Sequence, residues 1–289
     1  MKNLWILPLA MVATIACAQE KPACGDRAVI SDGWKLSREG VAMHYDAAVP
    51  STVAGVLSEA GFFGDDLLVG RNYEKVDKSI FDEPWIYATT FAGKPGKGQH
   101  TELVFGGLNS YADIFLNGKQ IASADTTAGV FIRRAYDVTD LLKKQNTLEV
   151  KLRRAQSGDL NHGYVDWNPR PLDESMGIVR PVTLHTTGAL SIEDVYVVPD
   201  LDVETFETAD LSVRVTLRNW EDKPVEGTLV LNLQDAETAT SPWPSPPARR
   251  RRSRSPVPMS RCCVSTTRAS GGPMTWERPS SIHSPSPWR

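Results

Sequence analysis

The sequence has little cysteine or histidine, and neither is arranged as a metal site or a disulfide framework. The four cysteines are Cys17, Cys24, Cys262 and Cys263, and the five histidines are scattered along the chain. Structural metal sites need Cys and His ligands at short, regular spacing, and disulfide scaffolds need an even set of well-spaced cysteines. The sequence therefore predicts no metal centre, no disulfide framework and no cofactor.

Long hydrophobic runs are also missing, and the apolar stretch at residues 4–15 is too short for a permanent transmembrane helix. Lys2 before this stretch and the small residues 16–18 after it are typical of an export signal, which we expect to span residues 1–18. Residues 14–17 also read as a loose lipoprotein box, in which Cys17 would be lipidated. Soluble export and lipid anchoring both stay open, so we expect a periplasmic or extracellular protein that meets a membrane only through such an anchor.

Helical periodicity is scarce, and residues 52–60 are the best short candidate for a helix. From residue 28 to about 235, short alternating or β-branched runs are separated by turn residues, for example at 101–105, 112–116, 146–152 and 211–217. Asn117 and Gly118, directly before the returning run 119–122, form the strongest short hairpin signal. The pattern predicts an all-β fold of the sandwich type.

A boundary is expected near Gly188, because one series of strands closes at 182–186 and another begins at 192–198. We therefore predict one domain over residues 28–187 and a second unit over residues 190–236. The second unit has three or four predicted strands, whereas an immunoglobulin-like sandwich has about seven. We expect a partial immunoglobulin-like β-sandwich that leaves the apolar faces of 192–198 and 211–217 uncovered.

Residues 240–289 lack lysine, contain nine Arg, ten Pro and eleven Ser, and show no periodicity, which predicts a disordered tail. An arginine-rich segment at 249–256 is also typical of RNA binding, but an exported protein is not expected to have a nucleic-acid partner. A shifted reading frame explains the composition differently. Back-translation of residues 271–277, read one base earlier, permits Trp-Trp-Pro-Asn-Asp-Met-Gly, and residues 281–289 permit an alternating strand. We interpret the tail as an out-of-frame product.

Several segments together resemble the N-terminal region of glycoside hydrolase family 2, of the β-mannosidase and exo-β-glucosaminidase type. The resemblance covers residues 30–235, in family order and at family spacing. It implies a galactose-binding-like jelly-roll β-sandwich over residues 28–187. One departure is Val179, where the family usually has an aromatic residue. The segments that carry the resemblance are V-P-S-T-V at 49–53, E-P-W-I-Y at 83–87, G-G-L-N-S-Y-A-D-I-F-L-N-G at 106–118, Y-D-V-T-D-L-L at 136–142, G-Y-V-D-W-N-P at 163–169 and M-G-I-V-R-P-V at 176–182.

Asp166, Trp167 and Asn168 are the candidate substrate-binding residues. Sugars present apolar C–H faces and many hydroxyls, so their recognition combines aromatic rings with carboxylate or amide hydrogen bonds. In the family, the matching loop reaches the catalytic barrel and its Asp contacts the sugar, which assigns this role by resemblance to Asp166. The alternative is that Asp166 forms a turn and Trp167 packs in the core. Arg180 is expected to pair with Asp173 or Glu174, and Trp34, Trp85 and Trp220 are expected in the core.

No catalytic residues are predicted in this chain. A retaining glycosidase needs two carboxylates about 5 Å apart, which this family carries as Glu on a barrel of about 250 residues, and no such segment follows residue 235. We expect the N-terminal accessory part of an exported retaining β-glycosidase, whose partners are β-linked mannoside or glucosaminide ends. The alternative is a stand-alone carbohydrate-binding module.

Overall fold

The computed structural model describes residues 26–156, 158–159, 163–167, 170–205, 208–233, 236–245 and 260–270. The expected export signal with Cys17, and also Asn168, lie outside these residues. Within the described part of the chain, no helix has the length and apolar character needed to cross a membrane.

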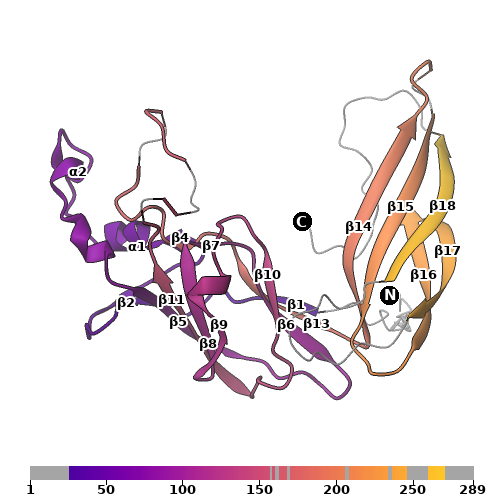
Figure 1. Cartoon of the computed structure of the whole chain (residues 1–289), viewed down its shortest axis with the longest axis horizontal. Helices are drawn as coiled ribbons and strands as arrows, with labels where there is room; N and C mark the ends of the chain where they lie inside the picture. Colours follow the sequence, from indigo (N-terminus) through magenta and orange to yellow (C-terminus); the bar gives the residue numbers. More distant parts are fainter. Residues whose placement is uncertain are drawn as a thin grey trace, which may run out of the picture.

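The N-terminal unit is a sandwich of antiparallel sheets, as the sequence predicts (Figure 1). The first sheet has six strands in the order β3-β2-β5-β11-β8-β9, and the second has four in the order β1-β13-β6-β10. The strands of the first sheet are β2 (Lys35–Arg38), β3 (His44–Asp46), β5 (Trp85–Ala92), β8 (Tyr111–Leu116), β9 (Lys119–Ala122) and β11 (Gln145–Arg153). Those of the second are β1 (Asp26–Val29), β6 (His100–Phe105), β10 (Arg134–Asp137) and β13 (Val182–Thr187).

A small third sheet and short helices close one end of this sandwich. The sheet has the order β4-β12-β7, and its strands are β4 (Ser51–Thr52), β7 (Leu108–Asn109) and β12 (Gly177–Ile178). The helices are α1 (Val53–Glu59), α2 (Asn72–Lys75) and the 3-10 turns η1 (Lys78–Phe81) and η2 (Ala124–Thr126). Helix α1 confirms the predicted helix, and its N-cap Thr52 accepts a hydrogen bond from Gly55 N.

The strict alternation of buried and more exposed residues explains how these strands pack. In β8 and β11 every second residue is buried, so one face of the first sheet lies against the core and the other faces outward. The turn between β8 and β9 confirms the hairpin prediction, because Asn117 and Gly118 have φ of 53° and 79°. The core contains Trp34 and Trp85, which are 1% and 3% exposed, as predicted.

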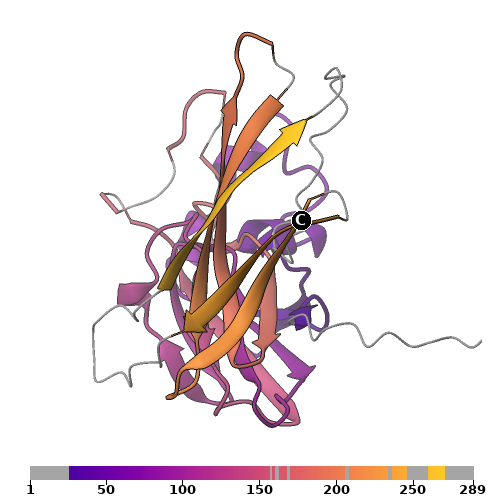
Figure 2. The same ribbon diagram turned by 90° about the vertical axis from the view of Figure 1, so that its right-hand side faces the viewer.

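The second unit is built from two small antiparallel sheets, β14-β15-β18 and β16-β17 (Figure 2). Its strands are β14 (Leu190–Leu201), β15 (Thr208–Asn219), β16 (Val225–Leu233), β17 (Ala236–Ser245) and β18 (Ser260–Ser270). Val213, Val215 and Leu217 are buried in a small core of their own, against which Val195 and Val197 are packed. The expectation that these faces are uncovered is therefore wrong, because β18 and β16 add to the unit.

Strand β18 also corrects the prediction for the tail. It pairs antiparallel with β15 from Ser260↔Leu217 to Ser270↔Thr208, and β17 continues to Ser245, so the prediction of a tail without strands is wrong for these residues. Residues 260–270 contain no proline or glycine, and each of their backbone N–H groups can therefore join a ladder. Composition over the fifty-residue tail hid this short segment.

The two units meet at the outer face of the four-stranded sheet, next to β6. Arg218 Nη1 lies 2.9 Å from Glu102 Oε1, and its guanidinium carbon lies 3.7 Å from the centre of the Trp220 ring. The Trp220 ring is stacked on His100, with centroids 5.4 Å apart. Trp220 therefore lies at this junction and is only half-buried, so the prediction that it packs in the core is wrong.

Candidate functional site

The predicted binding residues lie on the long connection between β11 and β12, which we name the 154–176 loop. Asp166 and Trp167 occupy a turn after Val165, and both side chains are exposed. Trp167 is 84% exposed, so the alternative that it packs in the core is wrong. Asp166 lies in a turn, which is compatible both with sugar binding and with a purely turn-forming role. The structure thus exposes a carboxylate and an indole at neighbouring positions of the loop.

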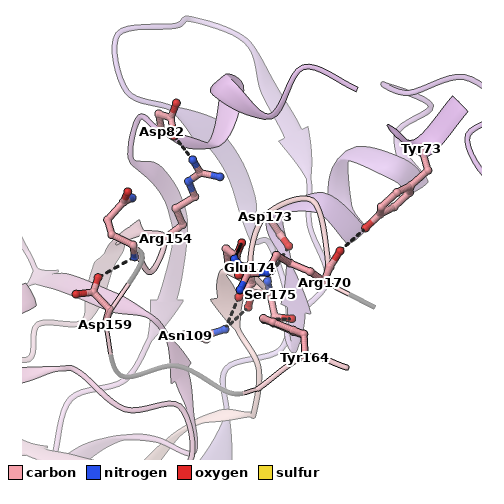
Figure 3. Close-up of polar contacts among 11 residues, drawn as sticks. Tyr73, Asp82, Asn109, Arg154, Asp159, Tyr164, Arg170, Asp173, Glu174 and Ser175 are labelled. Atoms are coloured by element: carbon pink, nitrogen blue, oxygen red, sulfur yellow. Dashed lines mark hydrogen bonds and ion pairs between the residues drawn. The ribbon is translucent and has the colours of Figure 1, made fainter. Parts of the chain in front are cut away.

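The first end of the 154–176 loop is anchored by Arg154. Its Nη2 donates to the Asp82 carboxylate, which follows η1 (Figure 3). Two residues further on, Gln156 N donates to Asp159 Oδ2 at 2.7 Å. These contacts fix the direction in which the chain leaves β11, because they tie it both to the η1 segment and to itself.

The second end of the 154–176 loop is anchored by the buried carboxylate of Asp173, which is 1% exposed. Its Oδ2 accepts from Ala54 N at 2.7 Å, and its Oδ1 accepts from Ser175 N at 2.9 Å. Burial raises the pKa of Asp173 to about 6, against the opposing effect of these N–H donors. Ala54 lies in the first turn of α1, where the N–H groups have no partner within the helix. Asp173 therefore ties the loop to the start of this helix.

Asn109 completes this anchor from β7 (Figure 3). Its Nδ2 donates to the backbone oxygens of Glu174 and Ser175, at 2.9 and 2.8 Å. Both of these residues have a left-handed backbone, with φ of 57° and 58°, which is uncommon for residues other than glycine. The Tyr73 hydroxyl also donates to the Arg170 backbone oxygen at 3.2 Å. Contacts from three separate segments therefore hold this end of the loop.

The arrangement supplies groups that can bind a polar ligand. Asp173 has the raised pKa of an acid catalyst, yet it is enclosed and bonded to backbone amides. Among the described residues, no group of three or more His, Cys, Asp or Glu side chains is placed to hold a metal ion. Asp166 and Trp167 supply the two chemistries that sugar recognition uses, a hydrogen-bonding carboxylate and an apolar ring.

Sequence reasoning missed most of the anchoring contacts. The prediction that Arg180 pairs with Asp173 or Glu174 is wrong. Asp173 is bonded to backbone amides, and Glu174 Oε1 lies 3.1 Å from Arg170 Nη1. Arg180 instead lies over the Phe131 ring, 5.5 Å from its centre. Asp173 is 119 residues away from Ala54 in sequence, so no local pattern could have revealed the bond.

The family model described as the glycosyl hydrolase 2 galactose-binding domain-like matches residues 34–180 of this sequence. The chain therefore belongs to glycosyl hydrolase family 2 through this domain, and the resemblance found in the sequence is confirmed.

Similar curated proteins are mainly exo-β-D-glucosaminidases. The chain is 37% identical over 221 residues to the exo-β-D-glucosaminidase of Hypocrea jecorina, an alignment that covers 70% of this chain and 25% of the relative. It is 30% identical over 214 residues to a mannosylglycoprotein endo-β-mannosidase of Lilium longiflorum, which covers 64% of this chain and 22% of the relative. The chain thus spans about a quarter of the length of these relatives.

Solved structures confirm the fold. The exo-chitosanase CsxA of Amycolatopsis orientalis aligns with a TM-score of 0.74 at 22% identity, over 85% of this chain and 29% of that one. A β-D-mannosidase from Dictyoglomus thermophilum aligns with a TM-score of 0.61 at 22% identity, over 84% and 31%. The similarity extends beyond residues 34–180, so it includes strands of the second unit.

Proposed function

We propose that this chain is the N-terminal accessory part of an exported, retaining β-glycosidase that acts on β-glucosaminide or β-mannoside ends. The observation that carries the proposal is the exposed Asp166 and Trp167 pair on an anchored loop of a family 2 sandwich. The names of the similar proteins favour a glucosaminide as the first substrate to test. We further propose that the second unit is the beginning of an immunoglobulin-like domain and that the protein leaves the cytoplasm through a signal in residues 1–18.

The chain by itself should bind but not hydrolyse. Its described sheets are all antiparallel, whereas the catalytic barrel expected for the family is built from parallel strands. The purified chain should show no turnover of aryl β-glucosaminides or aryl β-mannosides. Hydrolysis that co-purifies with the chain and is lost with it would refute this proposal. Reading the genomic DNA after codon 289 tests the same point, because a barrel-coding region in a shifted frame is expected there.

We also propose that residues 240–289 are read out of frame, so the role of Asp166 is tested in the protein translated with the frame restored. Asp166→Ala should lower kcat/KM. The expected loss of transition-state stabilisation is about 2–4 kcal/mol, which is typical for a lost charge-assisted contact. The melting temperature should change little, because the side chain is exposed and leaves no buried group without a partner. If Asp166 only forms a turn, the melting temperature falls and kcat/KM stays near that of the parent enzyme.

A stand-alone carbohydrate-binding module is the second candidate. It is favoured by the exposed Trp167, since an isolated sugar-binding domain also needs an accessible aromatic ring. The two candidates differ in the DNA beyond the tail, where a module predicts a terminator and no barrel-coding sequence. In either case Cys17 remains the proposed attachment point for a lipid, which acyl labelling of the Cys17→Ser variant would test.

A further inference from the structure

A polar pocket opens on the sandwich, at the first end of the 154–176 loop. It has a volume of about 270 Å³, and it includes none of the predicted binding residues. Asp82, Arg154 and Asp159 lie together at this place in Figure 3. The lining comes from five segments: Tyr111 of β8, Asp125 of η2, Arg153 at the end of β11, and Asp82 with Arg154, Gln156 and Asp159 from two loops.

The floor of this pocket is set by strand pairing. Tyr111 and Arg153 are direct partners across β8 and β11, so their side chains lie on the same face of the sheet. The preceding pair, Ala112 and Leu152, is fully buried in the core. Tyr111 and Arg153 therefore face outward, and they bring an aromatic ring and a guanidinium to one place.

The walls are held by hydrogen bonds within the protein. Arg154 is bonded to Asp82 and Gln156 N to Asp159, while η2 is fixed to the sheet because Ala124 N donates to Asp113 Oδ1 at 2.9 Å. This last bond positions the neighbouring Asp125. The pocket is thus organised before any ligand arrives, which lowers the entropic cost of binding.

Several groups in the pocket keep free bonding capacity. Asp125 and Arg153 form no ion pair with any described residue. Arg154 Nε is buried and has no hydrogen-bond acceptor among the described residues. Donors and acceptors therefore coexist beside the Tyr111 ring, which is the combination that a ring bearing several hydroxyls requires.

The charge and the volume of the pocket limit the class of ligand that it can bind. The lining holds three carboxylates and two guanidinium groups, so the pocket carries a net charge of about −1, which favours a cation over an acidic sugar. Its volume is below the roughly 300 Å³ at which pockets for drug-sized ligands begin, so it suits one sugar ring. We propose that this pocket is an auxiliary binding site for a single amino-sugar unit of a β-linked oligosaccharide.

In this site the protonated amine would lie against Asp125 and Asp159, and the hydroxyls would bond to Arg153 and Gln156. The choice of glucosamine as the amino sugar rests on the proposed function, whereas the preference for a cation rests on the pocket itself. An auxiliary site of this kind would hold a polymer near the catalytic domain and raise its local concentration.

The test is calorimetric titration of the full 289-residue chain with a β-linked glucosamine trimer at about pH 6, where an amine is protonated. We expect saturable binding that Asp125→Asn weakens by about tenfold, as expected for one lost charge-assisted contact. Tyr111→Ala provides a second variant for the ring contact. Asp140→Asn is the matched control, because it removes the same charge from an exposed position that does not line the pocket. Unchanged melting temperatures establish that each variant is folded.

Each alternative result overturns the proposal. Absence of binding does so directly, and so does equal binding of the N-acetylated trimer, which has the same rings without the charge. Binding that survives Asp125→Asn and Tyr111→Ala but is lost in Asp166→Ala would assign the sugar to the 154–176 loop tip, and would leave the proposed function standing. The proposed function fails separately, through an inactive frame-restored enzyme, and that failure does not affect this titration.

Discussion

Replacing Asp173 by asparagine should change how the stability of the sandwich depends on pH. The carboxylate is enclosed, and burial raises its pKa from 3.8 to about 6. The folded protein therefore holds this proton more tightly than the unfolded chain does. The resulting stabilisation is complete below about pH 4 and is lost as the pH rises through about 6.

The pKa difference sets the size of the effect. A rise from 3.8 to about 6 corresponds to about 3 kcal/mol of unfolding free energy between about pH 4 and pH 7. Asparagine cannot titrate, so the difference between wild type and Asp173→Asn should change by this amount, in favour of the wild type at acidic pH. The substitution also removes one hydrogen-bond acceptor. Ala54 N and Ser175 N donate to the two oxygens of Asp173, and in the variant one of these N–H groups meets the NH₂ of asparagine, which is also a donor. A pH-independent loss of about 1–3 kcal/mol is expected from that mismatch.

Urea unfolding from about pH 4 to pH 7, followed by tryptophan fluorescence, measures both quantities. Asp77→Asn is the matched control, because Asp77 is exposed and its pKa is lowered by the hydroxyl and backbone N–H of Ser79. The stabilisation from Asp77 is present above the unfolded pKa and is lost only as the pH falls further, so this control should not vary between about pH 5 and pH 7. A difference between wild type and Asp173→Asn that stays constant over the range, or that grows toward neutral pH, would refute the reasoning.

Three further substitutions test the packing. Trp34→Ala should cost about 3–5 kcal/mol of stability by denaturant unfolding, because the indole is fully enclosed; a loss below about 1 kcal/mol would contradict its place in the core. Gly177→Ala should destabilise by about 3 kcal/mol or more, because a Cβ at this position would lie 2.3 Å from the Ser51 backbone oxygen; a variant that melts like the wild type would exclude this close approach. Arg218→Met should raise the pKa of Glu102, which burial already raises, so its stability loss should be larger at pH 8 than at pH 4. An equal loss of stability at both pH values would show that the Arg218–Glu102 ion pair is not coupled to the ionisation of Glu102.

The features that the sequence predicted are those set by neighbouring residues. The hairpin at Asn117 and Gly118 follows from the need for positive φ, and helix α1 follows from a capping threonine before an apolar run. Trp34 directly precedes β2 and Trp85 begins β5, where large apolar side chains pack inward. Local chemistry was sufficient for each of these.

The features that it missed depend on contacts between distant segments. Strand β6 is buried on both faces because the second unit covers Glu102, and nothing in residues 100–105 indicates that neighbour. Trp220 has the composition of a core residue but lies between units, stacked on His100. The position of the candidate site on an exposed loop was predictable from the sequence. The hydrogen bonds of Asp173 and Asn109 that hold this loop were not.

The left-handed turn at Glu174 and Ser175 links the stability of the sandwich to the order of the loop. A left-handed backbone costs roughly 1–2 kcal/mol for each residue of this kind, and Asn109 and Asp173 offset that cost only while the sandwich is folded. A peptide with the sequence of the loop would therefore not adopt this turn in isolation. Substitutions that loosen β7 or α1 should release the tip that carries Asp166 before the sheets themselves melt, so loss of ligand recognition would be an early sign of damage far from the ligand.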